Sequence, residues 1–336
     1  MVISKTPHRI SFFGGGSDYP AWYREHGGKV IGVTIDKYSY ITCRVLPPFF
    51  EHKHKVVYSK VEAIRSFDEI EHPSARETLR YLVNELQEFD TSVGLEIHHD
   101  GDIPARAGMG SSSAFTVGLI KSLFALAGKV ISKEDLYKMA IHIEQNLIKE
   151  SVGSQDQVWA ALGGLNKIEF MSNGAIVSIP VIINESRMKY LEKRLMLFFT
   201  GLSRYATVVA QDQIKNLSAH KGELLRMMEM VDEAYRKLTA PGETVSGFGE
   251  LLHEAWMLKR GLSTQVSNDI VDAVYEKART SGATGGKLLG AGGGGFMLFY
   301  VEPEKQAAVK TALKDFLHVP FGFEFSGSEI IVYNGR

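Results

Sequence analysis

Residues 103–126 read IPARAGMGSSSAFTVGLIKSLFAL, and this stretch says most about the fold. Gly108 and Gly110 permit positive φ angles and let a ligand approach the backbone closely. Three serines at 111–113 then open an apolar segment with the length of a helix. Because the free N–H groups at a helix N-terminus attract anions, the stretch predicts a phosphate-binding loop.

This loop differs from two common nucleotide-binding patterns. A Walker A loop needs Gly-Lys-Ser/Thr, and a dinucleotide fingerprint needs a third glycine three residues after the second; neither is present here. A Rossmann oxidoreductase is therefore excluded. Taken alone, G-x-G-S-S also fits a glycine turn with serine N-caps, so the rest of the chain must decide.

Two further segments are rich in glycine. Residues 6–20, TPHRISFFGGGSDYP, place three glycines after an apolar strand and before Asp18, a carboxylate that can accept hydrogen bonds from hydroxyls. Residues 285–301 read GGKLLGAGGGGFMLFYV. Each segment alone also fits a tight turn or a hairpin before a strand, but three in one chain favour a shared ligand site.

Length and composition limit the class of protein. A chain of 336 residues predicts two domains, and 38 basic against 39 acidic residues exclude a basic field for nucleic acid or an anionic membrane. Cys43 is the single cysteine, which excludes an internal disulfide framework and is typical of a reducing compartment. Without a long apolar run or a readable targeting signal, we expect a cytoplasmic protein with no membrane association.

Hydrophobic patterning predicts α+β domains, because strands and helices follow one another without βαβ regularity. In the first half, residues 30–45 alternate as strands do, and residues 74–89 and 132–149 carry helical stripes. A polar stretch near 185–189 marks the boundary, so we expect domains at 1–188 and 189–336. The second half should contain, in order, a strand at 195–200, helices within 205–280, the last glycine segment, a helix at 304–317 and a final strand.

Two acidic residues are candidates for phosphoryl-transfer chemistry, which needs metal ligands and a group that positions the acceptor hydroxyl. Glu144 lies at the edge of the apolar stripe of its helix, and Asp156 opens a short apolar helix in the sequence GSQDQ. From spacing alone, Glu144 also fits an ordinary residue at the edge of the core, and Asp156 also fits a helix-capping acid.

The order and spelling of the three glycine segments resemble the GHMP kinases, named for galactokinase, homoserine, mevalonate and phosphomevalonate kinases. The resemblance covers essentially the whole chain, and P-x-x-x-G-M-G-S-S-S is its most specific motif. It implies an N-terminal domain like ribosomal protein S5 domain 2, a ferredoxin-like C-terminal domain, and ATP and Mg²⁺ as cofactors.

The resemblance also implies roles for individual residues. Asp156 would be the base or would orient the acceptor, and Arg9 beside it would favour orientation over strong basicity. Ser112 and Glu144 would be the Mg²⁺ ligands. The ATP-binding residues would be Gly108, Met109, Gly110, Ser111, Ser112 and Ser113, and the substrate-binding residues would be Gly15, Gly16, Asp18, Gly292 and Gly293.

Within the family, the opening RISFFGGGSDYP and the later GGKLLGAGGGGF are similar to the D-glycero-D-manno-heptose 7-phosphate kinases. This implies transfer to the anomeric C1 hydroxyl of a sugar phosphate by a monomer or homodimer. Fucokinase-like or other sugar 1-kinases share much of the pattern, and a silent sugar sensor is disfavoured by the intact catalytic motif. Four cations are candidates for the substrate phosphate: Arg106, Lys259, Arg260 and Lys287.

Overall fold

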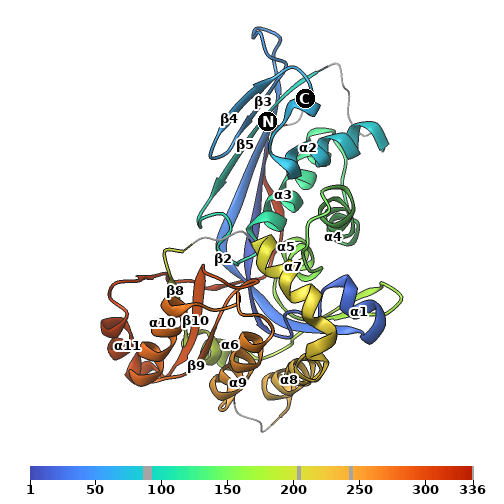
Figure 1. Ribbon diagram of the computed structural model, residues 1–336. Coiled ribbons are helices and arrows are strands. Elements are labelled where there is room, and N and C mark those ends of the chain that lie inside the picture. The colour runs from blue at the N-terminus through green and yellow to red at the C-terminus, as the bar shows by residue number, and fades with distance from the viewer. Residues whose placement is uncertain (86–92, 203–205, 242–244, 335–336) are drawn as a thin grey trace.

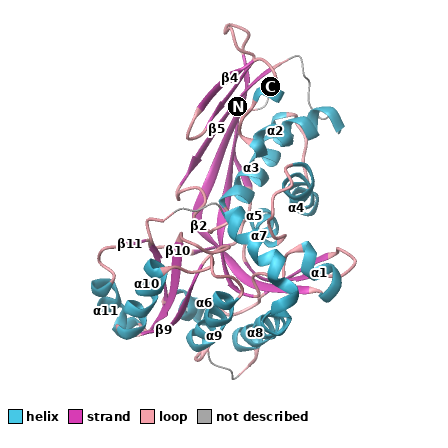
Figure 2. Ribbon diagram, viewed as in Figure 1, coloured by secondary structure: helices cyan, strands magenta, loops and turns pink. Residues whose placement is uncertain are grey.

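The computed structural model describes residues 1–85, 93–202, 206–241 and 245–334. Within these residues, two sheets are covered by helices (Figures 1 and 2). The first sheet contains β1 (Val2–Phe13), β2 (Gly28–Leu46), β3 (His54–Val57), β4 (Val61–Ile64), β5 (Gly94–Gly101), β6 (Leu165–Phe170), β7 (Ile176–Pro180), β12 (Phe323–Glu324) and β13 (Glu329–Tyr333).

The long strand β2 organises this sheet. It pairs antiparallel with β1 from Val2↔Cys43 to Phe13↔Ile31. Its first half also pairs with β6 and its second half with β5, which gives the order β13-β1-β2-β5-β3-β4 along the main path. The strand expected at 30–45 is therefore confirmed, and most of its β-branched residues are buried.

Helices cover one face of this sheet, to the right in Figure 1. α3 (Ser111–Leu126) is buried along most of its length because it lies between β1, β2 and its neighbouring helices. A Cβ on Gly118 would lie 2.9 Å from Thr6 Oγ1, so this glycine allows the close approach of α3 to the sheet. The neighbouring helical elements are α1 (Pro20–His26), η1 (Phe67–Glu69), α2 (Pro73–Arg80), the π-turn η2 (Tyr81–Glu85), α4 (Lys133–His142), the π-turn η3 (Ile143–Leu147) and α5 (Gln155–Leu162).

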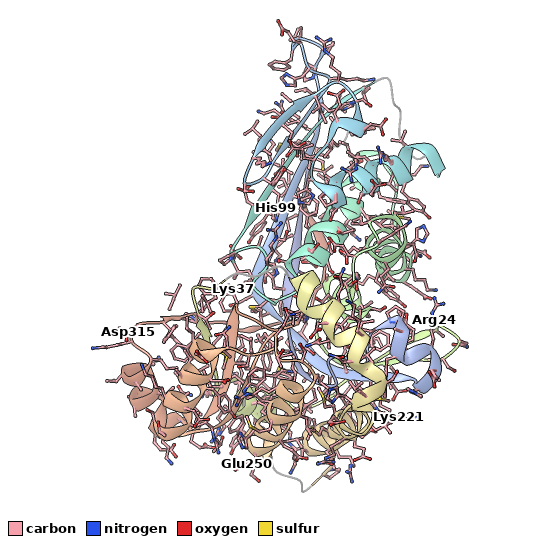
Figure 3. All side chains as sticks on the ribbon, viewed as in Figure 1. Arg24, Lys37, His99, Lys221, Glu250 and Asp315 are labelled. Atoms are coloured by element: carbon pink, nitrogen blue, oxygen red, sulfur yellow. The ribbon has the colours of Figure 1, made fainter. Side chains whose placement is uncertain are left out.

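The second sheet has the order β11-β8-β10-β9, and all its pairs are antiparallel. Its strands are β8 (Leu195–Phe199), β9 (Ala283–Leu288), β10 (Phe296–Val301) and β11 (Leu317–His318). The helical elements of this half are α6 (Glu185–Glu192), α7 (Ala206–Asn216), η4 (Leu217–His220), α8 (Lys221–Thr239), α9 (Phe248–Gly261), α10 (Asp269–Thr280), η5 (Pro303–Lys305) and α11 (Gln306–Ala312). Figure 3 shows the exposed side chains of Lys221, Glu250 and Asp315 pointing outward from this half.

The last strand of the chain, β13, lies beside the first strand, β1. β13 pairs antiparallel with β1, and Asn334 N donates to Met1 O at 2.9 Å, so the two termini lie side by side in Figure 1. The last strands thus belong to the first sheet, although a single cut at 188/189 assigns them to the second domain. The cut itself falls inside α6 and stays a prediction.

The α+β class is confirmed, while several helix bounds differ from expectation. The helix expected at 74–89 is α2 followed by η2 through Glu85, and residues 86–89 lie outside the described part of the chain. The helix expected at 132–149 is N-capped by Ser132 Oγ, which accepts from Asp135 N at 3.0 Å, and ends in the π-turn at Leu147. The stretch 205–280 forms the separate helices α7, α8, α9 and α10, with residues 205 and 242–244 outside the described part. Among the described residues, no helix is long and apolar enough to cross a membrane.

Candidate active site

A cavity of about 340 Å³ lies where the two halves meet. All three glycine-rich segments contribute to its wall, together with α5, α7, α9 and β9. The site residues expected from sequence that line it are Arg9, Gly15, Gly16, Asp18, Gly108, Gly110, Ser111, Ser112, Ser113 and Asp156. Four other expected residues, Met109, Glu144, Gly292 and Gly293, lie outside its lining.

Arg9 and Asp156 form a bidentate ion pair at the centre of the wall. Arg9 Nε donates to Asp156 Oδ1 at 2.8 Å, and Arg9 Nη2 donates to Asp156 Oδ2 at 2.7 Å. Arg9 Nη1 donates to Gly108 O at 2.8 Å, which ties the pair to the middle glycine segment. Such a fork holds a carboxylate in one orientation, while the remaining lone pairs of its oxygens can still accept a hydroxyl.

Asp18 is a second carboxylate on this wall. It is 2% exposed, and its Oδ1 accepts from Gly16 N at 3.0 Å. Burial first, and the charge of Asp156 second, raise the pKa of Asp18. A Cβ on Gly153 would lie 1.8 Å from Asp18 Oδ2, so a glycine at this position makes room for the carboxylate.

The middle segment places backbone amides at the cavity. Gly110 is the N-cap of α3 with φ 74° and ψ 27°, a left-handed conformation that favours glycine. A Cβ there would lie 3.3 Å from Asp156 Oδ2, so the loop also passes close to the acidic residue. The first amides of α3 have no intrahelical partner, and they follow directly after this loop. Negative charge placed at this end of the cavity would be stabilised.

The third glycine segment packs against the middle one. A Cβ on Gly290 would lie 2.4 Å from Gly108 Cα, and a Cβ on Gly295 would lie 2.3 Å from Ala107 O. Gly293 N donates to Val266 O at 2.9 Å, away from the cavity. From this loop, Gly290 and Ala291 line the cavity. The expected substrate contacts of Gly292 and Gly293 stay predictions, and the observed use of these glycines is close backbone packing.

Met109 points away from the cavity. Its side chain is fully buried in the core shared by the two halves, and its carbonyl oxygen accepts from Arg9 N at 3.3 Å. The predicted ATP contact at this position therefore concerns the backbone at most.

Glu144 is buried behind the wall. Its Oε2 accepts from Ser113 Oγ at 2.9 Å and from Gln157 Nε2. Its Oε1 has no hydrogen-bond partner within the described residues. Burial first, and the charge of Glu150 second, raise the pKa of Glu144 to about 7. The hydroxyl that Glu144 contacts is that of Ser113, while Ser112 is exposed at the cavity.

These oxygen groups match the chemistry of Mg²⁺, which takes carboxylate and hydroxyl oxygens and completes its shell with water and substrate phosphates. The unpartnered Glu144 Oε1 is a carboxylate oxygen available for such an ion. Across the described ranges, no cluster of three or more His, Cys, Asp or Glu side chains is placed to hold a metal.

The structure separates the four candidate cations. Arg106, Lys259 and Lys287 line the cavity. Arg260 does not, and its Nη2 lies 2.7 Å from Asp272 Oδ2 in an ion pair. Two buried lysines from the second half thus face the same space as the Arg9–Asp156 pair.

Sequence reasoning missed several residues of the wall. Ser11, Gln155 and Glu150 line the cavity, and Gln155 stands directly before Asp156, a position that its neighbour could have indicated. Gln213 of α7 also lines it and donates from Nε2 to Ala291 O at 2.8 Å. Nothing in the helical pattern around Gln213 signals a site, because its role depends on how α7 packs between the halves.

Comparison with known proteins identifies the family. The model for the GHMP kinases N terminal domain matches residues 74–164, and the model for the GHMP kinases C terminal domain matches residues 243–319. A D-glycero-alpha-D-manno-heptose 7-phosphate kinase of Campylobacter jejuni is 28% identical over 93% of both chains. A bifunctional fucokinase/GDP-fucose pyrophosphorylase of Arabidopsis thaliana is 26% identical over 90% of this chain and 30% of its own length.

A solved structure shares the fold. The crystal structure of a D-glycero-D-manno-heptose 1-phosphate kinase from Bacteroides thetaiotaomicron superposes with a TM-score of 0.82 at 23% identity, covering 99% of this chain and 100% of that one. The two-domain fold implied by the sequence resemblance is thereby confirmed. With both domain models matched and the three glycine segments meeting at one cavity, the chain belongs to the GHMP kinase family and is an ATP-dependent kinase.

Proposed function

We propose that this ATP-dependent sugar kinase transfers the γ-phosphate of ATP to the anomeric C1 hydroxyl of D-glycero-D-manno-heptose 7-phosphate. The observation that carries the proposal is the clamped Asp156, which faces the buried Asp18 beside the amides of the middle loop. The similarity to the heptose 7-phosphate kinase of Campylobacter jejuni supports the choice of acceptor. The product would be the 1,7-bisphosphate.

In this proposal Asp156 positions the acceptor. Both of its oxygens already accept from Arg9, so its orientation is set before substrate binds. The C1 hydroxyl would donate to a remaining lone pair of Asp156 and point its oxygen at the γ-phosphorus. The guanidinium beside it stabilises the charge of the transferring group, which favours positioning and electrostatics over proton abstraction.

The sugar hydroxyls and the nucleotide would occupy different parts of the cavity. Asp18 offers a buried carboxylate that accepts from hydroxyls, with Gly15 and Gly16 allowing the ring to approach the backbone. The triphosphate would lie along the start of α3, where Ser111, Ser112 and Ser113 would contribute backbone amides and Ser112 its exposed hydroxyl.

Magnesium fits the proposal through Ser112 and Glu144, with Ser113 holding the carboxylate of Glu144 in place. When bound, the ion would neutralise charge on the β- and γ-phosphates. The buried Oε1 of Glu144 supports this assignment because an unpartnered carboxylate oxygen is costly without a ligand. A monomeric or homodimeric state and a cytoplasmic location remain predictions from the sequence.

A substrate panel tests the function. Purified protein with Mg·ATP is offered D-glycero-D-manno-heptose 7-phosphate, free heptose, mannose and L-fucose, and ADP release is followed by a coupled assay. We expect the heptose phosphate to have the highest kcat/KM and ³¹P NMR to show the new phosphate coupled to the anomeric proton.

Two outcomes would contradict the proposal. Equal or better use of L-fucose would favour the fucokinase alternative. The similarity to the bifunctional fucokinase of Arabidopsis thaliana is the reason to include L-fucose in the panel. Binding of sugars without any ADP release would favour a sugar sensor on this fold.

A further inference from the structure

Two lysines of the second half are buried in the wall of the cavity. Lys259 of α9 is 5% exposed and Lys287 of β9 is 3% exposed. Neither forms an ion pair with a carboxylate in the part of the chain that the structure describes. Buried lysines are rare unless they are paired, because removing an ammonium group from water is costly. A negatively charged group in contact with both lysines would therefore be strongly favoured at this place.

Each of the two ammonium groups has one N–H donor that forms no hydrogen bond within the described residues. Lys287 Nζ donates to Ser11 O at 3.0 Å and to Phe12 O at 2.8 Å. Lys259 Nζ donates to Gly290 O and, at 3.4 Å, to Leu288 O. Because an ammonium has three N–H donors, one remains on each lysine.

A third buried polar group of the cavity wall also lacks a hydrogen-bond partner among the described residues. Ser11 Oγ is buried, lines the cavity and has no hydrogen-bond partner among the described residues. Ser11 is also the residue whose carbonyl holds Lys287, so its hydroxyl and that ammonium belong to one corner of the wall. Two unused ammonium donors and an unused hydroxyl match a tetrahedral oxyanion.

The charges around the pair agree with an absent anion. Burial first, and the charge of Arg9 second, lower the pKa of Lys259 to about 8, against the opposing effect of Asp18 and Asp156. Burial, then the charges of Lys259 and Arg9, lower the pKa of Lys287 well below its usual value. The positive charges of Lys259 and Arg9 thus disfavour the charged form of Lys287, and an anion placed between the lysines would favour it.

We propose that Lys259, Lys287 and the Ser11 hydroxyl form a subsite for the phosphate group that the acceptor already carries. The inference rests on the proposed function and adds the residues that recognise a phosphorylated sugar. The phosphates of ATP have their own donors at the start of α3, so the lysine corner is left for a second phosphate. Arg260 is excluded because it lies outside the cavity in an ion pair with Asp272.

The kinetic test measures the ratio of kcat/KM for heptose 7-phosphate to that for free heptose. Because hydrogen bonds to ionised groups are the strong kind, we expect Lys259→Met and Lys287→Met each to lower this ratio roughly 10–100-fold, and Ser11→Ala to lower it less. The KM for ATP should stay within a few-fold of the wild type. Arg260→Gln, next to Lys259 on the same helix, is the matched control and should leave the ratio unchanged.

Three results would overturn the proposal. The first is an equal ratio in Lys259→Met and in the Arg260→Gln control. A rise in the KM for ATP in place of a change in the ratio would assign the lysines to the nucleotide. Loss of activity toward both acceptors by the same factor would assign them a structural role, and Ser11→Ala checks this with a change too small to unfold the protein.

Calorimetry separates this inference from the choice of sugar. Inorganic phosphate is titrated at pH 8.5, with a non-hydrolysable ATP analogue filling the nucleotide end, in two buffers of different ionisation enthalpy. A bound phosphate raises the lysine pKa values, so binding should take up protons, and Lys259→Met should abolish both binding and uptake. If heptose 7-phosphate is not a substrate, the proposed function fails but this result still supports the subsite. Absence of binding, or binding unchanged in Lys259→Met, overturns it.

Discussion

The two parts of the cavity that we propose for the triphosphate and for the acceptor, here called the phosphate end and the acceptor end, are built by different means. The phosphate end is one continuous segment, in which Gly108, Gly110 and the serines at 111–113 present backbone amides at the start of α3. The acceptor end gathers Arg9, Asp18, Asp156 and two lysines from distant parts of the chain. The first end therefore relies on local backbone conformation, and the second relies on buried charges that tertiary packing brings together.

This difference predicts how each end responds to mutation. A backbone anion site tolerates the loss of one side chain, because the amides remain. A buried charge cluster does not, because removing one charge leaves its partner unpaired in a low-dielectric setting. Variants at the acceptor end should therefore have the larger effects.

The largest effect is expected for Asp156→Asn. The amide keeps the shape but loses the charge that Arg9 clamps and that orients the acceptor, so kcat should fall roughly 10²–10⁴-fold. Nucleotide affinity, measured by calorimetry, should remain. Asp68→Asn is the matched control, because Asp68 forms an exposed ion pair with Arg80 and should change kcat little. Activity within a few-fold of the wild type would contradict the proposed role of Asp156 in orienting the acceptor.

The next largest effect is expected for substitutions of the proposed metal ligands, Ser112 and Glu144. Ser112→Ala and Glu144→Gln should raise the Mg²⁺ concentration at half-maximal rate, and high Mg²⁺ should partly restore activity. Ser113→Ala should do the same through Glu144, whose carboxylate it holds, by roughly 10–100-fold. The measurement is a Mg²⁺ titration at saturating ATP. Curves that overlay the wild type for all three variants would contradict the assignment.

A steric change at the acceptor end should have a moderate effect. In Gly153→Ala the new methyl group would meet Asp18 Oδ2, and relieving this overlap should cost about 1–3 kcal/mol of stability and displace the carboxylate. Urea unfolding and the acceptor KM report the two consequences. Gly222→Ala is the control, since a Cβ there meets nothing within 4 Å. An equal free energy of unfolding and an equal acceptor KM in the two variants would show that the backbone around residue 153 shifts to accommodate the methyl group.

The smallest effect concerns a buried neighbour of Arg9 that faces the core. Burial first, and Arg9 second, lower the pKa of His8 to about 4. Since the unfolded chain then binds more protons than the folded one between about pH 6.5 and 4, stability falls as pH falls through this window. Between pH 7 and 5.5 the loss from this one group is about 1 kcal/mol.

His8→Gln tests this by removing the titrating group. Urea unfolding at pH 7 and 5.5 should show a smaller loss for the variant than for the wild type. His99 of β5, labelled in Figure 3, also carries a lowered pKa and remains in both proteins, and its charge is one of the causes that lower the pKa of His8. Identical losses would show that His8 does not titrate in this range.

Much of the fold was predictable because its signals are local. The alternation in residues 30–45 indicated β2, and the glycine-serine run indicated the start of α3. The π-turn that follows α4 at Ile143–Leu147 and the return of β13 to the first sheet carry no such signal. Both depend on contacts with segments far away in the chain.

The candidate site divides in the same way. Arg9 and Asp156 are 147 residues apart, and nothing in spacing or periodicity links them; only the family resemblance placed them together. Ser112 and Glu144 stay predicted Mg²⁺ ligands, and the contact between Glu144 and Ser113 had no signal in the sequence, because the direction of a side chain at a helix start depends on what the helix packs against.

By itself, the sequence determined three glycine segments, an apolar helix, a balanced net charge and an α+β pattern, while the kinase activity was implied by the resemblance of those segments to the GHMP kinases. These properties follow from backbone freedom, hydrophobic period and composition, which every local stretch carries with it. Only the tertiary structure decided which cations face the cavity. Lys259 and Arg260 are adjacent on α9, yet one is buried in the cavity wall and the other pairs with Asp272, because a helix turns successive side chains to different faces.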